Sequence, residues 1–225
     1  MNINNLKPIG ALAQNYGAKI LLYGQAGCGK TPLITTAPNP VVCVTEPGIL
    51  SLKGNNNIPA VDCYTGAAIE DFFKWALNSS EAKQFETICV DSISQVAEIF
   101  LKDELPKHKN KMQAYGMMLD RTMNIVNGLY YAQGVNVYMT AKLDRHQDGE
   151  VWFNRPAFKG QQLSIEIPHL FDEVFFVEMK IAAGGVMQPV INTRAGYNFI
   201  ARDRSGKLQP TEEMNIAKII QKINN

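Results

Sequence analysis

Blocks of apolar residues recur along this chain with two different periods. Four short runs are almost continuously apolar, which is typical of strands buried on both faces of a parallel sheet. These runs cover residues 19–23, 40–45, 85–90 and 135–140. Three longer segments carry apolar residues at helical spacing, at residues 67–78, 92–105 and 111–132. The alternation predicts an α/β fold with a mostly parallel central sheet flanked by helices on both faces.

The last third of the chain has a different pattern. Apolar runs at residues 174–181 and 187–193 flank the turn-forming segment 183–185, and this arrangement predicts an antiparallel hairpin. A further strand is expected near Tyr197, and a last helix from Thr211. We therefore expect antiparallel strands at the C-terminal edge of the sheet.

The composition fits one domain that spans residues 1–225. With 225 residues and 46% hydrophobic content, the chain can bury a full core. We expect a cytoplasmic protein with no membrane partner, because no apolar stretch is long enough to cross a bilayer and no secretory signal is recognisable. The four cysteines lack C-x-x-C spacing, which favours buried reduced thiols. Because the net charge is only +1, any contact with nucleic acid depends on a local cluster of cations.

The most specific motif follows the first apolar run. Residues 24–31 form a complete G-x-x-x-x-G-K-[ST] phosphate-binding loop. Its glycines let the backbone turn tightly and direct N–H groups at a phosphate, which the N-terminus of a following helix also favours. The lysine supplies charge to the phosphates, and the threonine hydroxyl is placed to ligate Mg²⁺. The predicted cofactors are therefore ATP and Mg²⁺, and the predicted nucleotide contacts are Gly24, Gln25, Ala26, Gly27, Cys28, Gly29, Lys30, Thr31 and Pro32.

Asp91 ends the third apolar run and is the second candidate for the metal site. In a P-loop fold, a carboxylate at such a strand end faces Mg²⁺ from the side opposite Thr31. The alternative is that Asp91 is the N-cap of the helix that begins near Ser92. Because Ser92 is not a second acid, the base that activates water is expected elsewhere in the chain.

Glu46 follows the second apolar run and is the best candidate for that base. If its strand lies beside the strand that precedes the phosphate loop, Glu46 is near the γ-phosphate. The alternative is that residues 45–48, Thr-Glu-Pro-Gly, are only a polar turn that leaves the sheet.

The order of these motifs resembles a known family. The segments GQAGCGKT, VVCVTEPG, TICVDS, VYMTAKLDR, PHLFDEVFFVE and FIARDRSGKL follow one another as in the RecA-like ATPase core. More closely, the chain resembles the phage single-strand annealing proteins related to RecA and RadA, which are called Sak-four proteins or phage nucleotide-binding proteins. The resemblance covers residues 18–208. It implies a RecA-like P-loop NTPase fold and a Mg²⁺-dependent ATPase, weak or stimulated by DNA, in the cytoplasm of a bacterial host.

The resemblance also implies catalytic roles for four residues. The family's catalytic glutamate corresponds to Glu46. The γ-phosphate sensor corresponds to Lys142, where RecA and RadA have glutamine, and this lysine either stabilises phosphate charge or is a surface lysine at a strand end. Arg202 and Arg204 resemble the basic pair that RecA-like rings and filaments insert into the neighbouring subunit's nucleotide. The alternative for this pair is an edge strand whose charges block aggregation.

Residues 144–168 form a long connection in which cations alternate with aromatic residues. The segment takes the position of the second DNA-binding loop of RecA-like proteins, and its rings offer stacking surfaces for unpaired bases. The alternative is a small hairpin whose aromatic residues pack on the core. The predicted DNA contacts are Arg145, Trp152, Phe153, Arg155 and Lys159. A second basic cluster, at residues 107–111, is interpreted as a solvated helix connection.

Two classes of function remain open at this point. The first is an ATP-dependent recombination protein that binds single-stranded DNA and promotes annealing or strand pairing. It would assemble as a ring or filament with ATP at the subunit interfaces, and a single-strand-binding protein is a further candidate partner. The second is a P-loop small-molecule kinase, or a nucleotide-dependent assembly switch that does not bind DNA.

Overall fold

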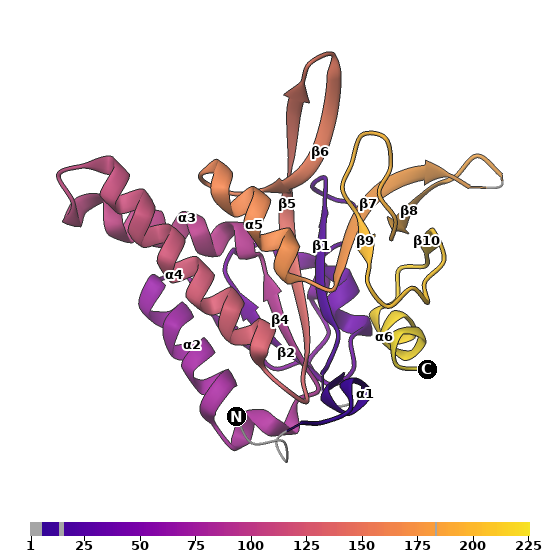
Figure 1. Cartoon of the computed structure of the whole chain (residues 1–225), viewed down its shortest axis with the longest axis horizontal. Coiled ribbons are helices and arrows are strands. Elements are labelled where there is room, and N and C mark those ends of the chain that lie inside the picture. Colours follow the sequence, from indigo (N-terminus) through magenta and orange to yellow (C-terminus); the bar gives the residue numbers. More distant parts are fainter. Residues whose placement is uncertain (1–5, 14–15, 183) are drawn as a thin grey trace.

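A mixed β-sheet forms the centre of the molecule (Figure 1). The computed structural model describes residues 6–13, 16–182 and 184–225. Within these residues the strand order is β10-β8-β7-β1-β5-β4-β2-β3, with β6 paired to β5 and β9 paired to β7. The strands are β1 (Lys19–Gly24), β2 (Pro40–Val44), β3 (Ala60–Asp62), β4 (Thr87–Asp91), β5 (Asn136–Asp148), β6 (Val151–Ala157), β7 (Glu173–Ile181), β8 (Met187–Asn192), β9 (Arg202–Asp203) and β10 (Thr211–Glu212).

Parallel strands make up the interior of this sheet, from β7 through β1, β5, β4 and β2 to β3. All six residues of β1 are buried, because β1 has a paired strand on each side and packed side chains on each face. The four predicted buried strands are confirmed, and the antiparallel edge is confirmed by β7, β8 and β10. The turn of the β7–β8 hairpin was expected at residues 183–185, of which residue 183 lies outside the described residues.

Helices cover the two faces of the sheet unequally (Figure 1). The helices are α1 (Ile9–Ala13), α2 (Gly66–Asn78), α3 (Ile93–Glu104), α4 (Lys111–Tyr131), α5 (Gln161–Leu170) and α6 (Ile216–Asn224), with 3-10 turns η2 (Pro32–Thr36), η3 (Leu50–Leu52), η4 (Glu81–Gln84) and η5 (Leu105–Lys107). Helices α2 to α5 pack on one face, where Phe72, Phe100 and Met118 are buried. On the other face, η2 and α6 bury Ile34 and Ile219. Helices on both faces were expected, and this prediction is confirmed.

The helix expected after the phosphate loop is only the five-residue turn η2. The hydroxyl groups of Thr35 and Thr36 donate to the carbonyls of Pro32 and Leu33, at 2.8 and 2.7 Å. Such local bonds compete with the helical ladder, and Pro38 cannot continue it. The segment therefore stops after one tight turn.

Two further expectations at the end of the chain are wrong. No named strand lies near Tyr197 in the described residues, where Phe199 makes only isolated bridges with Asn154 and Gly196. The last helix begins at Ile216 rather than at Thr211, because the Asn215 side chain accepts from the Lys218 N–H and caps the helix there.

The segment 144–168 is not an open connection. Strand β5 continues past the sheet and pairs with β6 in an antiparallel arm, from Lys142 opposite Ala157 to Asp148 opposite Val151. The arm projects from the body (Figure 1), and α5 follows it. The hairpin alternative is thus closer to the structure. The sequence signal for this hairpin is the dipeptide Asp148-Gly149, because Asp-Gly is common in hairpin turns and Gly149 has the positive φ of +60° that such turns require.

All four cysteines are free and buried, as expected for reduced thiols. Among the described residues, none of the helices combines the length and the apolar content that a membrane crossing requires.

Candidate nucleotide-binding site

The phosphate loop joins the carboxyl end of β1 to η2. Gly27 and Gly29 have φ values of +80° and +89°, which residues with a Cβ rarely adopt. At Gly24, a Cβ would lie 2.6 Å from the backbone oxygen of Val177 in β7. The backbone path therefore requires all three glycines of the motif.

Lys30 folds back over this loop. Its ammonium group donates to the carbonyls of Gly24 and Gln25, at 2.8 and 2.7 Å. From the sheet below, the Tyr138 hydroxyl donates to the Lys30 carbonyl at 3.0 Å. Because η2 is so short, the helix dipole that was expected to favour phosphate is small here, and the loop N–H groups and Lys30 are the groups that could bind a phosphate.

Asp91 connects the loop to the centre of the sheet. The Thr31 hydroxyl donates to Asp91 Oδ2 at 2.6 Å, and the Thr140 hydroxyl donates to Asp91 Oδ1. Asp91 is 5% exposed. It is not the N-cap of α3, because the side chain that accepts from the first turn is that of Ser92. The alternative role of Asp91 as a helix cap is therefore wrong.

These oxygen atoms fit Mg²⁺, which prefers hard oxygen ligands and one or two carboxylates. The Thr31 hydroxyl gives its hydrogen to Asp91, so its lone pairs remain open to a cation. In the described part of the chain, no three His, Cys, Asp or Glu side chains gather as they would around a metal held entirely by protein. The donor set is thus one that would share a metal with bound phosphates and water.

Glu46 lies two strands further from the loop than the sequence suggested. The expectation that β2 lies beside β1 is wrong, because β5 and β4 lie between them. Glu46 nevertheless reaches the neighbours of Asp91: Ser92 Oγ donates to Glu46 Oε1 at 3.2 Å, and Lys142 Nζ lies 4.0 Å from Glu46 Oε2. The carboxyl edge of the sheet therefore brings Lys30, Thr31, Asp91, Glu46 and Lys142 into one region.

Two side chains of α3 lie closer to the Lys142 ammonium group than the Glu46 carboxylate does. Its ammonium group donates to Gln95 Oε1 at 2.7 Å and to Glu98 Oε1 at 3.1 Å. Its backbone N–H donates to Ser94 Oγ at 2.9 Å, which fixes the end of the sheet portion of β5 against α3. Lys142 is therefore oriented by its own chain and is positioned beside Glu46.

Arg202 and Arg204 lie at the opposite, amino edge of the sheet. In β9, Arg202 pairs with Val174, close to where β7 begins beside Ile20 of β1. Strand β1 has six residues, so this edge and the loop are roughly 17 Å apart along the strand. The two arginines therefore lie far from the phosphate loop of their own chain.

Both arginines bind the last turn of α5 and the two residues that follow it. Arg202 donates to the carbonyls of Pro168 and Phe171, and Arg204 binds Asp172 at 3.1 Å and the His169 carbonyl at 2.9 Å. Helix ends leave carbonyls without partners, which cations satisfy. Burial is the main cause that lowers the pKa of Arg202, and nearby Arg204 adds to it. Arg204 is the more exposed of the two.

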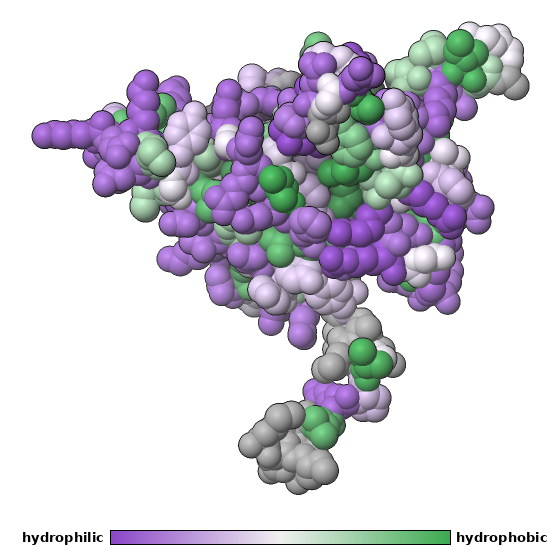
Figure 2. Space-filling model, turned by 45° about the horizontal axis from the view of Figure 1, so that its top comes forward, coloured by the Kyte–Doolittle hydropathy of each residue, from purple (hydrophilic) through white to green (hydrophobic). Residues whose placement is uncertain are grey.

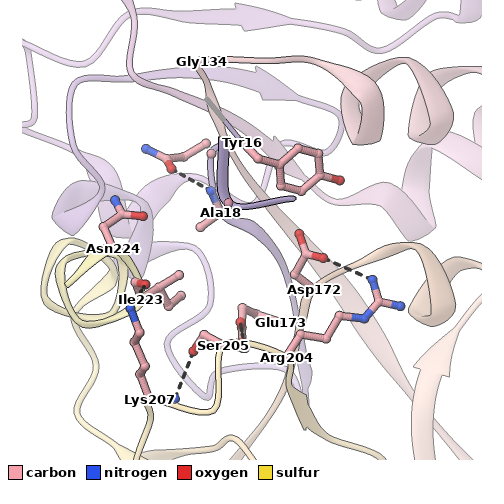
Figure 3. Close-up of a pocket in the computed structure, with 13 residues that line it drawn as sticks. Tyr16, Ala18, Gly134, Asp172, Glu173, Arg204, Ser205, Lys207, Ile223 and Asn224 are labelled. Atoms are coloured by element: carbon pink, nitrogen blue, oxygen red, sulfur yellow. Dashed lines mark hydrogen bonds and ion pairs between the residues drawn. The ribbon is translucent and has the colours of Figure 1, made fainter. Parts of the chain in front are cut away.

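A cavity of about 870 Å³ lies beside Arg204 (Figure 3). Tyr16, Asp172, Glu173 and Lys207 are among its lining residues. Glu173 is 1% exposed, and burial, together with the charge of Asp203, raises its pKa to about 8. The amino edge thus holds a carboxyl group that is largely protonated at neutral pH.

The structure divides four of the five predicted DNA contacts between the two faces of the β5–β6 arm. Arg145 and Trp152 lie on one face, with the guanidinium 5.8 Å from the centre of the indole ring. Phe153 and Arg155 lie on the other face and line a cavity of about 430 Å³ together with α5. Arg155 pairs with Asp144 at 2.9 Å, and exposed Lys159 follows the arm. The five residues therefore do not form one continuous surface.

Sequence reasoning missed three residues that support the site. Tyr138 supports the loop, Thr140 orients Asp91 and Ser92 holds Glu46. The available signal was the alternation of Tyr138 and Thr140 along one strand, which places both on the same face of the sheet.

The sequence identifies the family to which this chain belongs. Residues 16–205 match the AAA domain family. The chain belongs to this AAA domain family. Its fold is that of a RecA-like P-loop NTPase, with a mostly parallel central sheet, flanking helices and an antiparallel C-terminal edge. For an AAA domain, the P-loop implies a bound nucleotide, usually together with Mg²⁺.

Two solved structures are similar to this chain at low sequence identity. A KaiC-like protein from the hyperthermophilic archaeon Pyrococcus horikoshii OT3 is 14% identical over 79% of each chain, with a TM-score of 0.44. The flagellar accessory protein FlaH from Methanocaldococcus jannaschii is 12% identical over 92% of this chain and 91% of that chain, with a TM-score of 0.45. No curated protein matches the sequence of this AAA domain.

Proposed function

We propose that this AAA domain protein hydrolyses ATP with Mg²⁺ and uses the nucleotide cycle to bind and pair single strands of DNA. The observation that carries the hydrolysis is the approach of Glu46 to Ser92 and Lys142, directly beside the Thr31–Asp91 pair. A general base must lie within reach of the water that attacks the γ-phosphate. Glu46 and Glu98 both lie near Lys142, and Glu46 is the one that also accepts from Ser92, the residue next to Asp91.

Each residue of the site then has one task. The loop N–H groups and Lys30 would bind the phosphates, and the Thr31 hydroxyl and Asp91 would hold the Mg²⁺. Bound Mg²⁺ would neutralise charge on the β- and γ-phosphate oxygens. Ser92 and Lys142 orient the Glu46 carboxylate, which accepts a proton from the attacking water.

Replacing Glu46 with glutamine tests this assignment. Glu46→Gln keeps the size of the side chain and its hydrogen bond from Ser92 but removes the base, so kcat should fall by about 100-fold or more while ATP still binds. Glu98→Gln is the matched control, because Glu98 also pairs with Lys142 and is similarly exposed. Steady-state phosphate release and equilibrium binding of ATP measure both effects. If Glu46→Gln hydrolyses ATP as fast as Glu98→Gln, Glu46 is not the base.

The DNA part of the proposal is supported by the β5–β6 arm. Trp152 is 50% exposed at the projecting part of the molecule, and Arg145 lies over its ring. An exposed indole beside a cation suits an unpaired base that stacks and a phosphate that follows it. In a chain of net charge +1, this local pair is more informative than the overall charge.

Trp152→Ala should weaken binding of a single-stranded oligonucleotide by roughly 5- to 150-fold, since stacking contributes about 1–3 kcal/mol per base. Tyr197→Ala is the control, because Tyr197 is 81% exposed but lies outside the arm. Fluorescence anisotropy at fixed salt, with and without ATP, measures the affinities. No DNA binding in any nucleotide state would favour the assembly switch, and phosphoryl transfer to a nucleoside or sugar would favour the kinase.

Assembly of several chains completes the proposed site. Arg204 lies at the sheet edge opposite its own loop, so it can meet a γ-phosphate only in a neighbouring subunit. Arg202 is turned toward carbonyls of its own chain, which supports a structural role for it. We therefore assign the contact across the interface to Arg204, in a homo-oligomer with ATP between subunits. Annealing of complementary strands, as in the Sak-four proteins, would be the resulting activity.

A further inference from the structure

The hairpin of β7 and β8 exposes an unusual amount of apolar surface. Ile181 is 74% exposed, Val186 67% and Met187 52%. Figure 2 shows this apolar end as the projecting part at the upper right of the molecule. Contiguous apolar surface of this kind is rare on a monomer and marks an interaction site.

The hairpin is apolar on one face only. Ile181 pairs with Met187 and Met179 with Pro189, so these side chains share a face, while Lys180 lies on the other. Lys180 is held there by Glu178 and Asn192. The apolar face therefore keeps its orientation and is free to bind a partner.

This apolar face lies next to the phosphate loop. Strand β7 passes the loop at Val177, and it continues four residues further to Ile181. Met179 and Met187 line a cavity of about 350 Å³ together with Gln25 and Cys28 of the loop. A partner bound to the hairpin would therefore be close to the nucleotide.

An apolar groove of about 520 Å³ lies at the opposite edge of the same chain. Its lining includes Leu77, Phe85, Ile88, Tyr131 and Val135, and its polar members are Ser79, Lys83 and Gln133. These residues come from the carboxyl ends of α2 and α4 and from the starts of β4 and β5. The Tyr131 side chain is 72% exposed there. One chain thus carries an apolar projection at one edge and an apolar recess at the other.

The spacing of the two features agrees with one head-to-tail contact. Four residues of strand separate Val177 from Ile181, which is about 13 Å. Arg204 lies at the start of β7, and the groove lies at the start of β4, three strands away in the sheet. The distance between Arg204 and the groove across the sheet is therefore about 14 Å. A neighbour whose groove receives the hairpin would therefore bring its Arg204 toward the phosphate loop.

We propose that the β7–β8 hairpin binds the groove around Tyr131 on a second copy of this chain. The contact is heterologous, because projection and recess are different surfaces, so repeated copies form a ring or an open filament. The proposal rests on the proposed function in that it places Arg204 beside the neighbour's nucleotide. Docking itself requires only the apolar surfaces.

Two lysine variants test the contact. Met187→Lys removes the projection, and Tyr131→Lys removes the recess at the end of α4, where the helix dipole favours a cation. Each should weaken self-association by about 30-fold or more, as expected for a central apolar contact. Met112→Lys is the matched control, because Met112 is 81% exposed on α4 near the α3–α4 turn. Analytical ultracentrifugation with ATP measures the sizes.

Mixing the two variants gives the decisive result. A Tyr131→Lys chain keeps its hairpin and a Met187→Lys chain keeps its groove, so the equimolar mixture should form particles of two chains and nothing larger. Assembly of Met187→Lys as large as that of wild type would overturn the inference. A wild-type chain that stays single and binds phosphatidylcholine vesicles would overturn it in favour of a lipid surface. Loss of assembly in the variants without any ATP hydrolysis by wild type would uphold docking and reject the proposed ATPase.

Discussion

The two edges of the central sheet use their charged residues in different ways. At the carboxyl edge, Thr31, Thr140 and Ser92 hold two carboxylates in place, and the oxygen atoms of these carboxylates keep lone pairs that could bind a ligand. At the amino edge, Arg202 and Arg204 bind carbonyls of their own chain, and only Arg204 is substantially exposed. One edge gathers polar groups that could bind a ligand, whereas the other is a stable surface that offers one cation. In the proposed function, each edge supplies half of a site that two chains complete.

Thr140→Val removes a hydroxyl group from the carboxyl edge while it conserves the shape of the side chain. The change leaves Asp91 without one of its two hydroxyl donors, so the carboxylate loses its fixed orientation. We expect hydrolysis to fall by about 10- to 100-fold, as for other residues that orient metal ligands, and the Mg²⁺ concentration for half-maximal rate to rise.

The matched control is Thr122→Val, which removes a buried hydroxyl on α4 that donates to the Met118 carbonyl at 2.8 Å. It should lower the free energy of unfolding by about 1 kcal/mol and leave the Mg²⁺ dependence unchanged. An unaltered Mg²⁺ dependence in Thr140→Val would mean that Thr140 does not orient the metal site.

Glu173→Gln tests whether the buried carboxyl group at the amino edge carries a proton. Because its pKa is raised to about 8 in the folded chain, Glu173 keeps its proton between about pH 4.5 and 8, while the unfolded chain loses it. The folded state binds the extra proton, so the free energy of unfolding falls as pH rises through this range, by up to about 1.4 kcal/mol per pH unit.

Glutamine has no proton to lose, so the stability of Glu173→Gln should depend less on pH than that of wild type. Urea unfolding at pH 5, 6, 7 and 8 measures the difference. Hydrolysis by the variant should be close to that of wild type at neutral pH, because glutamine matches the neutral, protonated form of Glu173. Parallel pH profiles for the two proteins would show that Glu173 is ionised at neutral pH.

The features that sequence predicted well are local. The buried strands, the phosphate loop and the strand that ends in Asp91 each have a pattern within fewer than ten residues, and the structure contains all three. Glu46 shows the limit of this approach. Its strand was recognised, but its distance from the loop depends on the order of strands in the sheet, which long-range pairing decides.

The arm and the helix after the loop were mispredicted for other reasons. In β5 the strand continues beyond the sheet, so the change from buried to exposed positions looked like the end of the strand. In η2, threonine hydroxyls bonded to the backbone, and this competition outweighed the motif's usual helix. Thr140 was missed because its role exists only when β5 lies between β1 and β4.

The most direct test of a nucleotide site shared between chains is a mixture of two inactive variants. Glu46→Gln lacks the base but keeps Arg204, and Arg204→Ala lacks the arginine but keeps Glu46. If neighbouring chains complete each other, random assembly of equal amounts makes about a quarter of the interfaces complete, and the mixture should recover hydrolysis to about that fraction of the wild-type rate. A mixture that hydrolyses ATP only at the average rate of the two separate variants would contradict the account.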